Sequence, residues 1–456
     1  MATNNTITLK LIVDKSRNQV VYAEADSKFV DILLSFLTLP IGTILSLTNN
    51  KLFSPGSLNN LYQSVVDLDD KYFDLMASKA MLLHPSNSAE GKLSDLAIHI
   101  EGSTVLQYYV CDESCHWELL SPYANTKCRC GASMARKVKV TRKRSSCEEY
   151  EGVFMKGLTR FMISDGWVIT PASTRVVLSL LEQVNSFEER EVHFGPSDII
   201  RLLRCSLDSN TVLTDAFLAE RDRSNSSKIP GIVVRQNRRT SSSSIANIKL
   251  KLFIDRKDKK VIYAECDEYF IDLLFRFLTF PMGYVVKKLE GKFPISCYNN
   301  LYKSVLNLDE ASYFQTCSRD FLINPMLPEH LYYHNQLINI PARAPDKFYM
   351  CRTSCCQSTD LSLIANVRCQ CGVITNKRMK LIDCREIIKR TVYMVTDDLV
   401  VTPLPSISVI SLYLMRAREG VEEMDVTVGE DEALALLQAS MISKTVLTDL
   451  FTAEQN

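Results

Sequence analysis

The chain has 456 residues, of which 53 are basic and 53 acidic, and 46% are hydrophobic. This length exceeds what one hydrophobic core serves, so two or more domains are expected. The balanced charge excludes a global field that would draw the protein to nucleic acid or to an anionic membrane, and any such attraction must be local. The first residues lack the pattern of a secretory signal, and the most apolar runs, 29–39 and 273–286, are too short to cross about 30 Å of hydrocarbon. We therefore expect an intracellular protein, cytoplasmic or nuclear, with no membrane partner.

The sequence contains a tandem duplication. Five segments of the first half return in the same order in the second, and the matched pairs are 9–14 with 250–255, 20–26 with 261–267, 59–62 with 299–302, 170–171 with 402–403, and 211–215 with 445–449. This pattern predicts two homologous lobes, one over residues 7–220 and the other over 248–456.

Each lobe is predicted to open with a β-hairpin and a capped helix. Ile7, Leu9 and Leu11 alternate with polar residues, which is typical of a half-buried strand. Asp26 is a candidate N-cap for a helix that ends before Pro40, and a second short helix follows Pro40. Glu24 and Asp26 are the most suggestive pair of carboxylates, but we interpret them as a solvent-facing acid and the helix cap.

Further helices are predicted over 57–66, capped by Ser57, and over 69–82, with extended chain over 96–110. Asp165-Gly166 predicts a two-residue turn in a hairpin, and Asp397-Asp398 takes its place in the second lobe. Each lobe then ends with a helix, a short strand and two helices. The predicted ranges are 173–184 and 192–194 with a last helix from about 211, and 406–415 and 425–428 with a last helix from about 445.

The segment 221–247 joins the lobes and is basic and rich in serine. It cannot bury enough apolar surface to offset the entropy of ordering, so we expect a flexible tether. A phosphorylated or nucleic-acid-binding segment is the alternative.

Two pairs of cysteines occur in each half, and they are the candidate metal ligands Cys111, Cys115, Cys128 and Cys130, and Cys351, Cys355, Cys369 and Cys371. His116 and Cys356 directly follow the second cysteine of each set and are alternative ligands. In a reducing compartment clustered thiols favour metal over disulfides, and zinc prefers four such ligands in a tetrahedron. Buried thiols or a redox pair remain the alternatives.

The second pair in each half has the form Cys-x-Cys-Gly. Residues two apart on a strand point to opposite faces, so Cys128 and Cys130 can converge only where the backbone bends, and Gly131 and Gly372 suit such a bend. A site saturated by four protein ligands is structural rather than catalytic, and up to two zinc ions are predicted. Four further cysteines, Cys266, Cys297, Cys317 and Cys384, are predicted to be core thiols.

The run 136–144 is the densest positive charge in the chain. It suits phosphate binding beside a zinc module, or compensation of the negative charge of thiolates on a metal. No phosphate loop, nucleophile elbow or His-Glu-x-x-His element occurs, and none of the six histidines has a counterpart in the other half.

Taken together, the duplicated hairpin, the Phe-x-Asp-x-Leu-x-x-Phe-Leu-Thr-x-Pro-x-Gly helix, Asn-Asn-Leu-Tyr, the cysteine pairs and Thr-Val-Leu-Thr-Asp resemble the plant-specific domain-of-unknown-function 674 family. The resemblance covers nearly the whole chain and implies a plant protein, without an established activity to carry over. The sequence thus predicts an α+β protein of two lobes, each with a β-hairpin, helices and a zinc-ribbon-like loop. We interpret it as a non-enzymatic module that binds an unknown protein partner. A nucleic-acid-associated factor and an enzyme with a cleft between the lobes are the alternatives.

Overall fold

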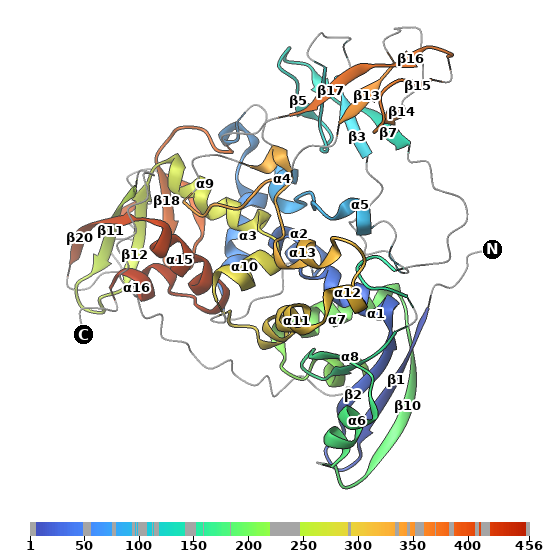
Figure 1. Ribbon diagram of the computed structural model, residues 1–456. Helices are drawn as coiled ribbons and strands as arrows, with labels where there is room; N and C mark the ends of the chain where they lie inside the picture. Colours follow the sequence, from blue (N-terminus) through green and yellow to red (C-terminus); the bar gives the residue numbers. More distant parts are fainter. Residues whose placement is uncertain are drawn as a thin grey trace.

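The computed structural model describes residues 6–48, 56–74, 79–93, 96, 98, 107–111, 113, 118–141, 152–157, 159–182, 184–218, 247–290, 293–332, 337–343, 347–351, 360–369, 371–382, 387–405, 410–411 and 420–452. It confirms an α+β fold built from two tandem repeats. Figure 1 shows two β-sheets on either side of a group of helices, with a third β-structure set apart from them. The predicted linker 221–247 lies outside the described residues except for Asn247.

The sheet of the first repeat has five strands in the order β10-β1-β2-β8-β9. The predicted hairpin is confirmed, since β1 and β2 pair antiparallel. Strand β10 is longer than predicted because most of its side chains face solvent and give no hydrophobic signal. The bounds are β1 Ile7–Asp14, β2 Gln19–Asp26, β8 Arg160–Ser164, β9 Ile169–Pro171 and β10 Phe187–Phe194.

The second repeat forms the corresponding sheet, in the order β19-β18-β12-β11-β20. Its edge strand β20 pairs with β11 as β10 pairs with β1, so the closing strand of each repeat lies beside the opening strand. The bounds are β11 Ile248–Asp255, β12 Val261–Cys266, β18 Tyr393–Thr396, β19 Val401–Pro403 and β20 Val421–Val428.

The helix after each hairpin begins at the predicted cap. Asp26 accepts hydrogen bonds from the backbone N–H groups of Lys28 and Phe29, and Asp267 accepts one from Tyr269. Phe29, Ile32 and Leu33 are fully buried, and each such side chain contributes about 1.5–3 kcal/mol to stability. The following proline starts the next helix in both repeats. The bounds are α1 Ser27–Ser35, α2 Ile41–Leu47, α9 Glu268–Arg276, the 3-10 turn η2 Phe277–Thr279 and α10 Met282–Lys288.

The remaining helices depart in part from prediction. The helix predicted over 69–82 is a 3-10 turn followed by a separate short helix, with 75–78 outside the described residues. Most of the helix predicted over 406–415 also lies outside them. The bounds are α3 Leu58–Asp67, η1 Asp70–Tyr72, α4 Lys79–Leu83, α5 Glu90–Leu93, α6 Thr174–Leu181, α7 Pro196–Asp208, α8 Val212–Phe217, α11 Ser296–Asn307, α12 Glu310–Tyr313, α13 Ser318–Ile323, η3 Glu329–Leu331, α15 Glu430–Ile442 and α16 Val446–Phe451.

The two repeats exchange a helix. Helix α3 of the first repeat packs against β19 of the second, and α11 of the second packs against β9 of the first. The hydroxyl of Ser64 accepts a hydrogen bond from the backbone N–H of Val401, and the hydroxyl of Ser304 accepts one from Ile169, each at 2.9 Å. Ser57 is not the predicted side-chain cap, because its hydroxyl donates instead to the carbonyl of Ser443. The main core is therefore shared by both repeats.

A pseudo-twofold arrangement brings the helices after the prolines together. Pro40 and Pro281 form an antiparallel bridge, and the backbone N–H of Gly283 donates to the carbonyl of Leu37 at 2.7 Å. A Cβ atom on Gly42 would lie 2.2 Å from the carbonyl oxygen of Leu82. Only glycine fits this close approach of backbones.

The cysteine-rich segments of both repeats build one small barrel. Its strands run β3-β7-β14-β13-β17-β4, and the circle closes where Tyr109 and Ser121 exchange two backbone hydrogen bonds, of 2.7 and 2.9 Å. Strands β7 and β14 join the repeats on one side, and β17 and β4 on the other. The bounds are β3 Gln107–Val110, β4 Leu119–Leu120, β7 Arg136–Thr141, β13 Phe348–Met350, β14 Asp360–Ser362 and β17 Lys377–Leu381.

The barrel has a core of its own, separate from the main core. Tyr108 and Phe348 meet there with ring centroids 4.9 Å apart, and Val138 and Leu361 are buried beside them. Figure 1 shows the barrel at one end of the helical body. Two short hairpins extend from it, β5 Thr126–Lys127 with β6 Ser133–Met134, and β15 Val367–Arg368 with β16 Ile374–Thr375.

Candidate metal centres

Three cysteines of the first repeat meet beside the barrel. Cys111 follows strand β3, while Cys128 and Cys130 lie in the turn between β5 and β6. Their sulfur atoms all lie within 4.8 Å of one another, and the sulfurs of Cys111 and Cys130 are 3.5 Å apart. Cys111 and Cys128 are buried and Cys130 is exposed.

The turn bends as the sequence predicts. The backbone N–H of Cys128 donates to the carbonyl of Ala132, and that of Gly131 donates to Cys128, both at 2.8 Å. Gly131 has a φ of +89°, in the left-handed region that glycine enters without a steric penalty. This reversal brings the sulfurs of Cys128 and Cys130 to the same side despite the single residue between them.

The second repeat reproduces this geometry. Cys351 follows β13, and Cys369 and Cys371 occupy the turn between β15 and β16, with 3.5 Å between the sulfurs of Cys351 and Cys371. The N–H of Gly372 donates to Cys369 at 2.8 Å, and Gly372 has a φ of +84°. Two separate sequences therefore fold into the same three-thiol cluster.

The donor set fits a tetrahedral metal ion. Zinc binds thiolate sulfur at about 2.3 Å, so two sulfurs on one ion are separated by about 3.8 Å. The observed 3.5 Å is close to that value and far longer than the bond of about 2.05 Å in a disulfide. Each triad could hold a metal ion. The remaining predicted ligands, Cys115 or His116 and Cys355 or Cys356, lie outside the described residues.

The surroundings of the two clusters differ. The first cluster is packed among Leu119, Met134 and Ile382. At the positions equivalent to Leu119 and Met134 the second repeat has Asp360 and Thr375, and its three cysteines are intermediate or exposed. The first centre is thus the more shielded from solvent.

The other predicted core thiols have mixed outcomes. Cys297 is fully buried and donates to the carbonyl of Ser206 at 2.8 Å, and Cys266 is also buried. Cys317 is exposed, so the prediction of a core thiol is wrong there. It has a φ of +60° at the start of α13. Cys384 lies outside the described residues.

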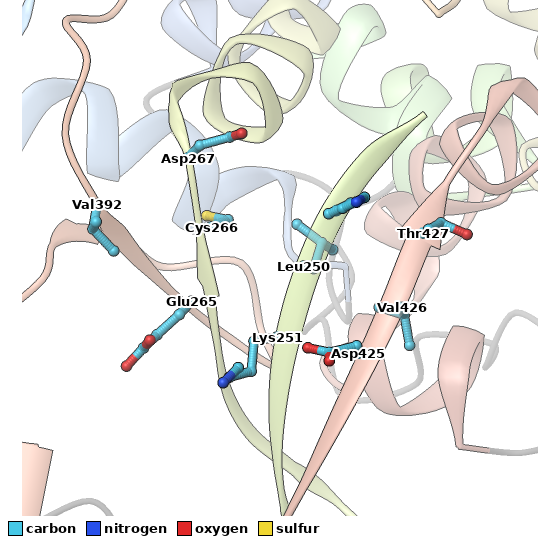
Figure 2. Close-up of a pocket in the computed structure, with 10 residues that line it drawn as sticks. Leu250, Lys251, Glu265, Cys266, Asp267, Val392, Asp425, Val426 and Thr427 are labelled. Atoms are coloured by element: carbon cyan, nitrogen blue, oxygen red, sulfur yellow. The ribbon is translucent and has the colours of Figure 1, made fainter. Parts of the chain in front are cut away.

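Each sheet carries an open concavity at equivalent positions. One, of about 540 Å³, is lined by residues including Lys251, Glu265 and Asp267, and Figure 2 shows them on neighbouring strands beside the start of α9. The other, of about 360 Å³, is lined by residues including Lys10, Glu24 and Asp26. The carboxylates Asp26 and Asp267 cap helices, as predicted for Asp26.

Several of the other charged groups in these concavities form ion pairs. Glu24 lies 3.3 Å from Arg160, and Lys251 lies 3.2 Å from Glu423. We interpret both concavities as grooves in the sheet surface, since Asp26, Glu24, Asp267 and Lys251 are engaged in structural contacts.

We compared the chain with models of known protein families. The family model described as a protein of unknown function (DUF674) matches residues 3–297 and 286–456, which together span nearly the whole chain. The chain belongs to the DUF674 family. Comparison with curated proteins and with solved structures gave no match. Within the described residues, no helix of this DUF674 protein is long and apolar enough to cross a membrane.

A buried and a partly buried carboxylate at the hairpin turns are a feature of this DUF674 fold that sequence reasoning missed. Asp165 accepts hydrogen bonds from the backbone N–H and hydroxyl of Thr214, at 2.9 and 2.7 Å, and Asp397 accepts the same pair from Thr448 at 2.8 and 2.6 Å. Burial raises the pKa of Asp165, and it raises the pKa of Asp397 to about 6. These carboxylates join the hairpin turn to the helix of the Thr-Val-Leu-Thr-Asp motif. The sequence signal that could have predicted this contact is that both the motif and the turn aspartate occur in each repeat.

The turn itself also differs from prediction. Its loop has three residues, because the N–H of Ser164 pairs with the carbonyl of Val168 and Trp167 adopts a φ of +68°. The Trp167 side chain is fully buried against Tyr298 of the other repeat, with ring centroids 5.9 Å apart. The tertiary contact therefore overrides the local Asp-Gly preference.

Proposed function

We propose that this protein is a non-enzymatic protein-interaction module whose shared barrel is stabilised by two structural zinc ions. The observation that carries the proposal is the recurrence of one three-cysteine geometry at equivalent places in the barrel. Burial of ordinary thiols does not explain this geometry, because Cys130 and Cys371 are exposed. Zinc in such a site acts as a cross-link and leaves no position for substrate once a fourth protein ligand binds.

Each centre would fix a hairpin turn to the end of a barrel strand. Cys111 holds the end of β3, and Cys128 and Cys130 hold the hairpin of β5 and β6. The barrel core is small, so the stability that a metal adds matters there. Structural zinc contributes on the order of 10–16 kcal/mol, as much as a typical domain has in total.

Metal analysis of the purified full-length chain tests the proposal. Two zinc ions per chain are expected from elemental analysis, one in Cys128→Ser/Cys130→Ser and one in Cys369→Ser/Cys371→Ser. Cys317→Ser is the matched control, since that exposed thiol lies outside both clusters, and it should keep both ions. A wild-type chain without stoichiometric metal refutes the proposal.

A nucleic-acid-associated role is the second candidate, and a charge asymmetry favours it. Strands β7 and β17 carry the sequences Arg-Lys-Val-Lys-Val-Thr and Lys-Arg-Met-Lys-Leu without an acidic residue, and Lys137, Arg378 and Lys380 are exposed. Contacts to phosphates would give binding that weakens steeply with salt. Titration of a labelled 20-nucleotide oligothymidine at 50 and 200 mM salt, with Lys137→Glu/Arg378→Glu as the variant, distinguishes this role.

We also propose an intracellular location, cytoplasmic or nuclear, in a plant. The support is chemical: thiolate ligands need the reducing conditions of those compartments. The third interpretation, an enzyme with a site between the repeats, has no supporting observation among the described residues. The two concavities described above lie on the individual sheets.

A further inference from the structure

The two hairpins beside the metal clusters occupy equivalent positions in the barrel. Backbone hydrogen bonds fix the equivalence, because Asn125 donates to Met134 at 3.0 Å and Asn366 donates to Thr375 at 2.9 Å. Tyr123 thus corresponds to Ile364, Thr126 to Val367, and Ala132 and Ser133 to Val373 and Ile374.

The first hairpin is seated on the helical body. The Tyr123 hydroxyl accepts hydrogen bonds from the backbone N–H and the hydroxyl of Ser86, at 2.9 and 3.0 Å. The ring of Tyr123 lies edge-on to buried His330, with centroids 5.7 Å apart. Tyr123 is 6% exposed and Thr126 is 2% exposed, so this end of the barrel is covered.

The second hairpin exposes apolar side chains at the positions equivalent to those of the first. Four aliphatic side chains, which we call the apolar tip, are exposed there: Ile364 at 67%, Val367 at 37%, Val373 at 37% and Ile374 at 47%. A tip that only faced water would be expected to carry the polar residues, yet the covered hairpin has the more polar set. Neighbouring exposed aliphatic groups of this kind mark interaction surfaces.

The chain around the apolar tip is rich in cations. Residues 361–382 include Arg368, Lys377, Arg378 and Lys380, and the nearest acids in sequence are Asp360 and Asp383, at either end of this range. Arg368 and Ile374 are directly opposite each other on β15 and β16, so a cation lies next to an exposed aliphatic group. The surface is therefore both apolar and basic.

We propose that the apolar tip and its flanking cations bind an acidic protein segment that carries bulky apolar side chains. This inference rests on the proposed function, for which it names the partner class. Aliphatic side chains favour a polypeptide over nucleic acid, because single-stranded nucleic acid is held by phosphate contacts and by stacking on aromatic rings. Apolar anchors would cover the tip, and carboxylates would pair with Arg368 and Arg378.

The chain's own linker does not fit this surface. Residues 221–247 contain six arginines and lysines, at positions 221, 223, 228, 235, 238 and 239, and a single acid, Asp222. Like charges would oppose its binding to the basic tip. The linker is therefore not the proposed occupant, which we take to be a segment of a separate protein.

Selection from a phage-displayed library of random 16-residue peptides tests the inference. Full-length zinc-loaded protein is the target, and Ile364→Ser/Ile374→Ser is used for counter-selection. The best peptide is then synthesised with a fluorescent label, and its affinity is measured by anisotropy. The selected peptides should combine several acidic residues with large apolar ones. Affinity should fall at least ten-fold for Ile364→Ser/Ile374→Ser and for Arg368→Glu/Arg378→Glu.

Controls separate this surface from the fold and from the metal centres. Leu178→Ser replaces another exposed aliphatic residue, 58% exposed on α6, and should leave peptide affinity unchanged. All variants should keep two zinc ions per chain, and a failure of the metal content would refute the proposed function rather than this inference.

Three results would overturn the inference. One is the absence of any peptide that distinguishes wild type from Ile364→Ser/Ile374→Ser. Another is oligothymidine binding that depends on these isoleucines, which would assign the surface to nucleic acid. The third is self-association in sedimentation velocity that these serines abolish, which would make a second copy the occupant.

Discussion

Replacing Ser304 with alanine tests the exchange of helices between the repeats. Ser304 is on α11 of the second repeat, and its hydroxyl accepts the backbone N–H of Ile169, which begins β9 of the first repeat. Ser304 and Ile169 are each 3% exposed, so water cannot replace the lost acceptor. An unsatisfied buried N–H costs about 1–3 kcal/mol, and the better helix propensity of alanine returns up to about 0.5 kcal/mol. We expect a net loss of about 0.5–3 kcal/mol.

Hydrogen exchange of individual amides gives the decisive readout. Ser304→Ala should accelerate exchange at Ile169, which is 135 residues away in sequence, and leave the amide of Val401 protected. The reciprocal variant Ser64→Ala should accelerate exchange at Val401 and leave Ile169 protected. If Ser304→Ala instead exposes Val401, each helix packs on its own repeat and the exchange is refuted.

Three further outcomes are expected. Gly42→Ala should destabilise the protein by about 1–3 kcal/mol or more in denaturant unfolding, because its Cβ would lie 2.2 Å from the Leu82 carbonyl oxygen, and an unchanged midpoint would contradict that packing. Burial lowers the pKa of His330 to about 4, so the stability from its neutral ring is complete above about pH 6.5 and is lost as the pH falls toward 4. As the pH falls over this range, His330→Phe should lose about 3 kcal/mol less unfolding free energy than the wild type. An unchanged pH dependence of stability would rule out His330 as its source. Zinc release to a chromogenic chelator should be biphasic, with the fast phase absent in Cys369→Ser/Cys371→Ser because that cluster is the more exposed, whereas a single phase would contradict the difference in shielding.

Local chemistry made several elements predictable. The cap at Asp26, the start of the second helix after Pro40 and the bend at Gly131 each follow from one residue with a specific backbone preference, and the structure confirms all three. Short signals of this kind act within a few residues and do not depend on the rest of the fold. The three-cysteine clusters were predictable for the same reason, since their turns are local and repeated.

The exchange of helices was not predictable, because duplication makes the two packings equivalent in pattern. The side-chain amide of Asn60 donates to the carbonyl of Asp398, and that of Asn300 donates to the carbonyl of Gly166. Each asparagine therefore bonds to the hairpin turn of the other repeat rather than to the equivalent turn of its own. A hydrophobic pattern cannot distinguish a contact within a repeat from the same contact across repeats. The common barrel escaped prediction in the same way.

The exchange and the barrel together mean that neither repeat completes its own structure. Strand β7 needs β14, and β17 needs β4, so the barrel closes only when both cysteine-rich segments are present. A metal ion bound in one repeat would then constrain strands of the other through these two junctions. The interior of the barrel is similar in the two repeats, but the outer surfaces differ. Tyr123 attaches one hairpin to the helical body, whereas Ile364, at the equivalent position of the other hairpin, is exposed. Duplication supplied the closed scaffold, and divergence at a few exposed positions made its two ends chemically different.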